Sequence, residues 1–302
     1  MQRDLVGYGT RVPTGSWPGG NRLAISVVVN YEEGSEQAFA NGDATQESLT
    51  EWGQYVYPPT IRNLAMESIF EYGSRTGVWR VFQAIEAHGI PATIFACAQA
   101  LEMNPEVAAH LRTSNHEVCS HGYRWEEVFR LSAEEEAAHI VQAVKSIEKT
   151  VGRAPVGWYC RYGPSERTRE LIVQTGQFLY DSDSYADDSP YFVDVNGAEH
   201  LVLPYTPDVN DFRFWQANGP VKADDFTDYL IDTFEELLAE SQHVPRMMSL
   251  GLHPRIIGRP GRIKSLRQFF THVENRPGVW FATREQIARA WLDMRAAEPV
   301  SG

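Results

Sequence analysis

The stretch Val27-Val28-Val29-Asn30-Tyr31-Glu32-Glu33-Gly34 decides the fold class of this chain. It is an apolar run that ends abruptly at two adjacent carboxylates and a glycine. A shorter run, His116-Glu117-Val118-Cys119, ends similarly at Ser120-His121-Gly122-Tyr123-Arg124-Trp125. In α/β enzymes the chemistry lies where parallel strands end. Both stretches therefore predict strands that deliver polar side chains to an active site.

Apolar runs recur along the chain and are separated by segments of helical period. Several runs are continuous rather than alternating, which is typical of strands buried on both faces of a parallel sheet. The predicted strands cover residues 23–29, 92–96, 117–119, 156–160, 178–180, 201–203, 247–252 and 279–281. This order predicts an α/β protein, either a β/α barrel or a doubly wound sheet.

The predicted helices carry terminal signals. Residues 78–89 are amphipathic and close on Gly89, which favours a helix end. Ser132 is placed as an N-cap, and Glu135 completes a capping box. Further helices are predicted over residues 223–240 and 283–294.

Two segments do not fit a minimal barrel, residues 35–76 and residues 183–220. Both are long and show few helical signals, and such loops usually form lids or interfaces. We interpret them as one cap over the C-terminal face of a single domain spanning residues 1–302.

Composition narrows the function classes. The net charge of −13 argues against nucleic acid and anionic membranes as partners. No apolar stretch is long enough for a transmembrane helix, and the N-terminus lacks the apolar region of a signal peptide. The three sparse cysteines, Cys97, Cys119 and Cys160, are typical of reduced thiols. Together these features predict a cytoplasmic protein.

Three motifs resemble those of the polysaccharide deacetylase family, which is also called the NodB-homology or carbohydrate esterase 4 family. They are Glu32-Glu33-Gly34, Ser120-His121 with Trp125 four residues on, and Leu252-His253 at the end of a late strand. The resemblance implies an irregular β/α barrel of seven or eight strands. It also implies that Glu32 occupies the position of a general base and His253 that of the acid that protonates the leaving group.

The same resemblance maps the family's metal ligands onto Glu33, His121 and Trp125. Because an indole nitrogen only donates, Trp125 cannot bind a metal, and catalytic zinc normally keeps three protein ligands. We therefore expect no metal and no other cofactor. A set of Glu, His and Trp is similar to the PuuE-type allantoinase branch, in which the resemblance implies metal-free hydrolysis of a cyclic amide.

The resemblance to this branch runs along nearly the whole chain and implies a homotetramer joined through the cap. The aromatic residues Phe39, Trp52, Tyr55 and Tyr57 of the first capping segment are consistent with an interface. Substrate-binding candidates are His121, Trp125, Arg161, Arg75, Asn210 and Asp211.

The expected function is hydrolysis of a cyclic amide by acid/base catalysis, in purine or pyrimidine catabolism. The loop Trp158-Tyr159-Cys160-Arg161-Tyr162-Gly163-Pro164 departs from the allantoinase pattern, so the ring is allantoin or another cyclic ureide or imide. Whether Glu32 or Glu33 is the base stays open. The alternatives are a deacetylase acting on N-acetylglucosamine polymers and a catalytically inactive sugar-binding homologue.

Overall fold

The computed structural model describes residues 3–49 and 57–297. A curled, mixed sheet forms its centre, and its strands are β1 (Leu23–Tyr31), β2 (Ala92–Ala96), β3 (Glu117–Ser120), β4 (Gly157–Trp158), β5 (Tyr180–Asp181), β6 (Tyr191–Val195), β7 (Ala198–Val202), β8 (Arg246–Leu252) and β9 (Val279–Phe281). The strand order is β6-β7-β5-β4-β3-β2-β1-β8, and β9 pairs with the first residues of β1. The expectation of an irregular β/α barrel is confirmed.

The two edges of this sheet are joined by a single β-bridge rather than by a pair of hydrogen-bonded strands. Apart from the antiparallel pair β6–β7, the strand pairs are parallel. A single parallel bridge joins Asn210, in the loop after β7, to Gly251 of β8. A side chain on Gly251 would collide with Asn210 and Tyr205, because its Cβ would lie 2.4 Å from an atom of each. Glycine therefore lets the loop close the barrel here.

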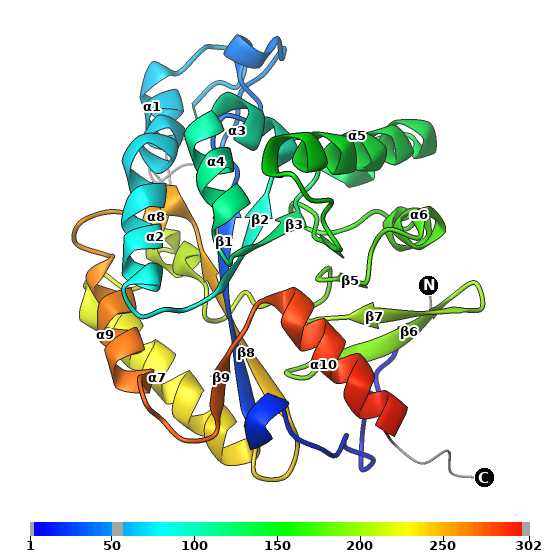
Figure 1. Cartoon of the computed structure of the whole chain (residues 1–302). Coiled ribbons are helices and arrows are strands. Elements are labelled where there is room, and N and C mark those ends of the chain that lie inside the picture. The colour runs from blue at the N-terminus through cyan, green and yellow to red at the C-terminus, as the bar shows by residue number, and fades with distance from the viewer. Residues whose placement is uncertain (1–2, 50–56, 298–302) are drawn as a thin grey trace.

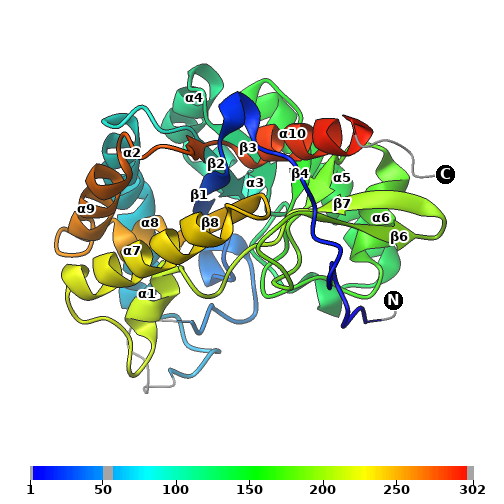
Figure 2. The same ribbon diagram turned by 90° about the horizontal axis from the view of Figure 1, so that it is seen from below.

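Helices surround the sheet, as Figure 1 shows. They are α1 (Leu64–Tyr72), α2 (Val78–Glu86), α3 (Ala98–Met103), α4 (Pro105–Thr113), α5 (Ala133–Val151), α6 (Thr168–Thr175), α7 (Ala223–Glu240), α8 (Pro254–Ile257), α9 (Lys264–Val273) and α10 (Arg284–Ala297). In Figure 2, α7 and α9 lie side by side, and the β6–β7 hairpin lies at the opposite end of the molecule. The predicted capping box at Ser132 and Glu135 is present at the start of α5.

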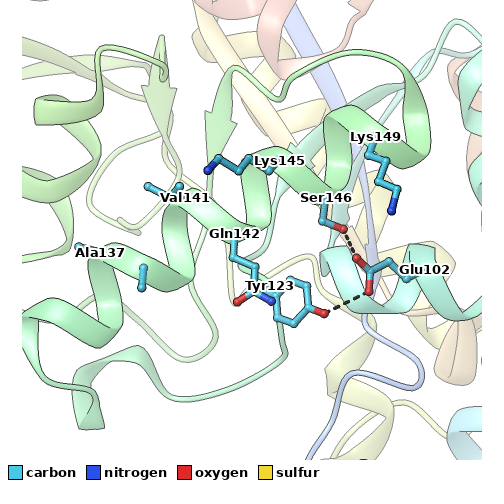
Figure 3. Close-up of a pocket in the computed structure, with 9 residues that line it drawn as sticks. Glu102, Tyr123, Ala137, Val141, Gln142, Lys145, Ser146 and Lys149 are labelled. Atoms are coloured by element: carbon cyan, nitrogen blue, oxygen red, sulfur yellow. Dashed lines mark hydrogen bonds between the residues drawn. The ribbon is translucent and has the colours of Figure 1, made fainter.

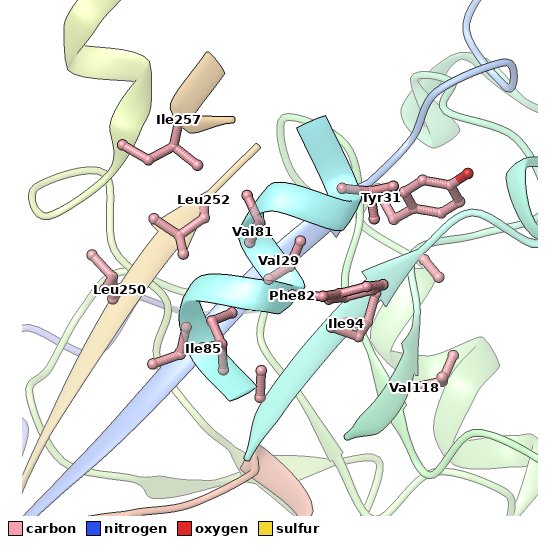
Figure 4. Close-up of a cluster of buried hydrophobic side chains, with 14 of the residues drawn as sticks. Val29, Tyr31, Val81, Phe82, Ile85, Ile94, Val118, Leu250, Leu252 and Ile257 are labelled. Carbon is pink, nitrogen blue, oxygen red and sulfur yellow. The ribbon is translucent and has the colours of Figure 1, made fainter. Parts of the chain in front are cut away.

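The core has two layers because side chains alternate along β1. Ile25, Val27 and Val29 pack outward against the helices, whereas Ala24 and Val28 point into the barrel. Figure 4 shows the outer layer, in which Val29, Leu250 and Leu252 face α2. This alternation also decides which polar residues of β1 reach the barrel interior.

The first capping segment contains more regular structure than predicted. Helix α1 falls within residues 35–76 and continues into α2 through a π-helical turn, η3 (Gly73–Gly77). A Cβ on Gly73 would lie 2.2 Å from Glu33 Oε1, and one on Gly77 would lie 2.1 Å from the Pro254 carbonyl oxygen. The two glycines thus let the helix contact the ends of β1 and β8. Trp52 and Tyr55 lie outside the described residues.

The second capping segment is partly a strand pair. Residues 191–202 form the β6–β7 hairpin, which the sequence analysis assigned to a loop apart from residues 201–203. The Asn196-Gly197 turn, with φ of 53° and 85°, is a usual hairpin signal that predicts this pair. Residues between 205 and 216 line a cavity at the C-terminal ends of the strands. None of the described helices is long and apolar enough to cross a membrane.

Candidate active site

A cavity of about 270 Å³ opens at the C-terminal ends of the strands. It is lined by Asn30, Glu32, His121, Trp125, Tyr159, Arg161, Tyr162, Tyr185, Tyr205, Thr206, Pro207, Asn210, Phe212, Gln216 and His253. Seven of these residues come from the segment 183–220, and none comes from the described part of the segment 35–76. The described part of the first segment therefore lies outside the lining, although its Glu47 contacts the lining residue Arg161.

The alternation along β1 separates the two adjacent glutamates. In the alternation along the strand, Glu32 falls on the same side as the inward residues Ala24 and Val28, and it lines the cavity. Glu33 falls on the outward side of the strand and lies buried beneath Gly73, so it does not line the cavity. Burial raises the pKa of Glu33 and raises that of nearby Glu36 to about 7. Of the two candidates for the base, only Glu32 faces the cavity.

Glu32 is held by three cationic or imidazole groups. Its Oε1 lies 3.3 Å from His121 Nε2 and 3.8 Å from His253 Nε2, and its Oε2 lies 2.7 Å from Arg255 Nη1. Burial by itself raises the pKa of Glu32, but Arg255 and the two histidines more than offset this and lower it below its usual value. Glu32 is therefore an anion at neutral pH.

Both histidines direct Nε2 toward Glu32 because their Nδ1 atoms are engaged elsewhere. His121 Nδ1 lies 3.0 Å from the carbonyl oxygen of Tyr159, and His253 Nδ1 lies 2.6 Å from Asp211 Oδ1. A carbonyl or carboxylate oxygen only accepts, so each Nδ1 carries a proton. His121 Nε2 is within hydrogen-bond distance of Glu32 at 3.3 Å, whereas His253 Nε2 lies 3.8 Å from Glu32 and in the neutral ring can accept a proton from a bound molecule.

Asp211 lies behind His253 rather than in the cavity. It is fully buried and accepts hydrogen bonds from the backbone nitrogens of His253 (2.7 Å) and Ile257 (3.1 Å). The prediction that Asp211 binds substrate is corrected, since its carboxylate is occupied in fixing the orientation of His253. In the sequence, 42 residues separate the pair.

Asn210 lines the cavity, but its amide is already engaged. Its Oδ1 accepts from the backbone nitrogen of Phe212, and its Nδ2 lies 3.4 Å from both the Tyr205 hydroxyl and the Thr206 carbonyl oxygen. These contacts give Asn210 a role in shaping the loop, and its predicted role in substrate binding stays a prediction.

Arg255 was missed by the sequence analysis. It is fully buried in α8, where its guanidinium lies 2.7 Å from Glu32 and 3.6 Å from Glu33. The rings of Phe70, Trp125 and Trp215 surround it at 4.7, 5.0 and 5.7 Å. Its position two residues after His253, just past a strand end, is the signal that could have identified it.

Arg161 and Trp125, two of the predicted substrate-binding residues, both line the cavity and are in contact with each other. The guanidinium carbon lies 3.9 Å from the Trp125 ring centroid, and Nη1 donates to the Trp125 carbonyl oxygen at 3.0 Å. Arg161 Nη2 also lies 2.6 Å from Glu47, which belongs to the first capping segment. Because Glu47 neutralises its charge, Arg161 offers donors to a bound molecule without requiring that molecule to be anionic.

Arg75 lies outside the cavity. Its side chain is 78% exposed and is 3.7 Å from Glu71 of the same helical turn. The prediction that Arg75 binds substrate is therefore corrected. The π-helical turn that carries it presents Gly73 and Gly77 to the barrel, and this points Arg75 toward solvent.

The residues at the family's metal positions do not fit a metal. Glu33 points away from the cavity and Trp125 cannot ligate, so His121 alone remains. Among the described residues, one trio brings its ligand atoms within 4.8 Å of one another, Glu86, His110 and His116, and it lies outside the cavity. There His116 Nδ1 accepts from the Ala92 backbone nitrogen, so its Nε2 carries the proton and is not available to a metal.

A second hollow lies on the surface between α3 and α5, and Figure 3 shows its side chains. Its one carboxylate, Glu102, accepts hydrogen bonds from the hydroxyls of Tyr123 (3.1 Å) and Ser146 (2.6 Å). The hollow contains none of the predicted site residues. The smaller cavity at the strand ends is therefore the candidate active site.

Comparisons with known proteins find relatives that are similar over nearly the whole chain. Residues 65–177 match the family model of polysaccharide deacetylases. The match includes His121 and Trp125 but ends before His253 and begins after Glu32. The crystal structure of PuuE allantoinase covers 100% of this chain with 99% of its own, at 43% identity and a TM-score of 0.93.

Two further relatives carry the name of the family. A probable polysaccharide deacetylase from Pseudomonas aeruginosa PAO1 is 42% identical, has a TM-score of 0.92 and covers 97% of this chain with 98% of its own. A putative polysaccharide deacetylase from Schizosaccharomyces pombe is 41% identical, and the alignment covers 96% of each chain. Similarity of this extent, over nearly the full length, shows that the chain belongs to the polysaccharide deacetylase family.

Proposed function

We propose that this protein hydrolyses a C–N bond of a small cyclic amide, allantoin or a related cyclic ureide or imide, without a metal ion. The observation that carries the proposal is the cavity itself. It has a volume of about 270 Å³, an aromatic wall formed by Trp125, and two histidines whose Nε2 atoms lie within 4 Å of Glu32. Such a space suits a flat ring that is surrounded and desolvated, whereas a polymer needs an open groove.

The similarity to PuuE allantoinase supports this proposal, since that enzyme is similar over the whole chain. A second candidate function is deacetylation of an N-acetylated sugar. It is favoured by the names of the relatives from Pseudomonas aeruginosa and Schizosaccharomyces pombe. Both reactions hydrolyse an amide, so the size of the substrate distinguishes them.

In the proposed reaction, His253 transfers the proton. Asp211 holds the Nδ1 proton, so the Nε2 lone pair takes a proton from water while the water oxygen bonds to the ring carbonyl carbon. The C–N bond then breaks, and His253 returns the proton to the ring nitrogen. Glu32 has a lowered pKa and is a weak base, so we assign it to orienting the water and stabilising the protonated imidazole.

The proposal is tested by a turnover screen of chelator-treated protein on allantoin, hydantoin, succinimide and an N-acetylglucosamine oligomer. We expect hydrolysis of at least one ring and none of the oligomer. Deacetylation of the oligomer without hydrolysis of any ring would overturn the proposal in favour of the second candidate. Activity that disappears on chelation and returns with one equivalent of zinc would overturn the metal-free mechanism.

A pair of arginine variants tests whether the reaction occurs in this cavity. Arg161→Ala removes donors from the wall and should raise KM by about tenfold or more, because hydrogen bonds to a charged group contribute roughly 1.5–3 kcal/mol. Arg75→Ala is the matched control, and it should leave both kcat and KM unchanged. Equal effects of the two variants would show that the ring binds elsewhere.

A further inference from the structure

The cavity contains a hydrogen-bond donor that the reaction above leaves unused, the hydroxyl of Tyr205. Its side chain is buried and lines the cavity. The hydroxyl oxygen accepts from Asn30 Nδ2 at 2.9 Å and from Asn210 Nδ2 at 3.4 Å. A tyrosine hydroxyl has one proton to donate, and two amide groups already occupy its acceptor capacity. Among the described residues, no acceptor is within hydrogen-bond distance of that proton.

The orientation of both amides is fixed by the backbone. Asn30 Nδ2 also lies 3.1 Å from the Leu252 carbonyl oxygen, so this atom is the nitrogen and its two protons are both used. Asn210 Oδ1 accepts from the Phe212 backbone nitrogen, so its other atom, facing Tyr205, is also a nitrogen. Flipping either amide would place an oxygen against a carbonyl oxygen or a nitrogen against a backbone donor. The Tyr205 oxygen therefore accepts twice, and its proton is directed toward the cavity.

These contacts place the hydroxyl between the two strand ends that carry the reacting groups. Asn30 lies two residues before Glu32 and on the same face of the β1 backbone. Leu252 directly precedes His253. The Tyr205 hydroxyl is thus anchored to both strand ends, and it shares one cavity with Glu32 and His253.

A buried arginine, Arg284, holds the backbone next to Tyr205 in place. Arg284 is fully buried and donates to the carbonyl oxygens of Leu203 and Pro204, which fixes the backbone just before Tyr205. Its guanidinium carbon lies 6.0 Å from the Tyr205 ring centroid. This support fixes the position of the Tyr205 hydroxyl before a substrate binds.

We infer that Tyr205 is a catalytic residue that stabilises the oxyanion of the tetrahedral intermediate. As the water oxygen bonds to the carbonyl carbon, the electron pair of the C=O double bond moves to the oxygen, which becomes negatively charged. The Tyr205 proton hydrogen-bonds to this oxygen and stays on the tyrosine. When the C–N bond breaks, the electron pair returns to re-form C=O. This role rests on the proposed function and supplies the charge stabilisation that a metal would otherwise provide.

The test is the variant Tyr205→Phe, which removes the hydroxyl and keeps the ring. Loss of one oxyanion donor costs roughly 100- to 1,000-fold in kcat. We expect a decrease of that size with KM changed by less than about threefold, because the charge develops only in the transition state. Tyr180→Phe is the matched control: Tyr180 is equally buried, but its hydroxyl donates to Glu117 outside the cavity. The control should keep kcat within about threefold.

A second variant covers the case in which Tyr205→Phe fails to fold. Replacing Tyr205 by 3-fluorotyrosine keeps the shape and the donor, so kcat should stay within about tenfold of the wild type. A kcat for Tyr205→Phe equal to that of the wild type, or a rise in KM alone, would overturn the role.

The comparison is made on whichever amide the wild type hydrolyses, since an oxyanion forms from a ring carbonyl and from an N-acetyl group alike. If the wild type acts on the N-acetyl substrate and Tyr205→Phe does not, the proposed function fails and the role of Tyr205 stands. If the wild type acts on a ring and Tyr205→Phe does so equally fast, the proposed function stands and the role fails. A wild type that hydrolyses neither would overturn both.

Discussion

Replacing Arg255 by Met should destabilise the protein because it leaves Glu32 buried without its countercharge. The two side chains lie 2.7 Å apart, and neither is more than 2% exposed. Removing one partner of a buried ion pair costs about 3–5 kcal/mol. For a chain of this size, roughly 2 °C of melting temperature corresponds to each kcal/mol. We therefore expect the melting temperature at pH 7 to fall by about 6–10 °C.

The loss should depend on pH in a stated direction. In the wild type the pKa of Glu32 is lowered, so its ionised form contributes stability above the usual glutamate range, and this is lost as the pH falls through the folded pKa. Without Arg255, the two histidines alone oppose the burial that raises the pKa of Glu32. The variant then regains a neutral Glu32 as the pH falls. The difference in the free energy of unfolding should be largest at neutral and higher pH and should shrink below about pH 5.

The assay is denaturant unfolding followed by circular dichroism between about pH 4 and pH 8, with a double-mutant cycle. Glu32→Gln in the Arg255→Met background removes the unpaired charge, and the coupling should be about 1–3 kcal/mol. Arg284→Met is the matched control, because Arg284 is equally buried but donates to hydroxyl and carbonyl oxygens. Glu32→Gln should not rescue it. A loss on Arg255→Met that is independent of pH and of Glu32 would refute the reasoning.

Three further outcomes are expected. Asp211→Asn should lower kcat by roughly 100- to 10,000-fold with little change in melting temperature, because an amide no longer fixes the tautomer of His253. A loss of kcat of less than about threefold in steady-state kinetics would contradict this. A Gly→Ala replacement such as Gly73→Ala normally favours a helix, but here the new Cβ would lie 2.2 Å from Glu33 Oε1. Thermal unfolding should therefore show that the free energy of unfolding falls by about 1–3 kcal/mol. Gly261→Ala is the control and should be near neutral, because Gly261 has open space around it. Trp125→His should raise KM by about tenfold through loss of the aromatic wall without creating a tight metal site, and one equivalent of zinc retained after dialysis would show otherwise.

Much of the fold could be predicted from local pattern. The continuous apolar runs identified eight of the strands, at least in part, and the capping box of α5 and the full extent of α7 were predicted correctly. These features depend on near neighbours in sequence: the period of apolar residues, a serine three positions before a glutamate, and a glycine after a helix. The hairpin turn at Asn196-Gly197 is of the same kind, and its signal was present in the sequence but not used.

The identity of the chemical groups was also readable from the sequence. Glu32 and His253 each follow an apolar run, and strand ends of a parallel sheet meet at one edge, so their convergence follows from the topology. Strand parity, applied to β1, would further have separated Glu32 from Glu33. What the sequence did not show is which charged residues would be used as partners.

Those partners were decided by tertiary structure. Asp211 contacts His253, 42 residues away in the sequence, and Glu47 of the first capping segment contacts Arg161. Arg255 and Arg75 are both arginines near predicted site motifs, yet one is fully buried against Glu32 and the other is 78% exposed. Periodicity fixes the face of an element on which a side chain lies, because it reflects backbone geometry. It does not fix which distant charge will meet that side chain, because this depends on how whole elements pack, and only the folded barrel sets that distance.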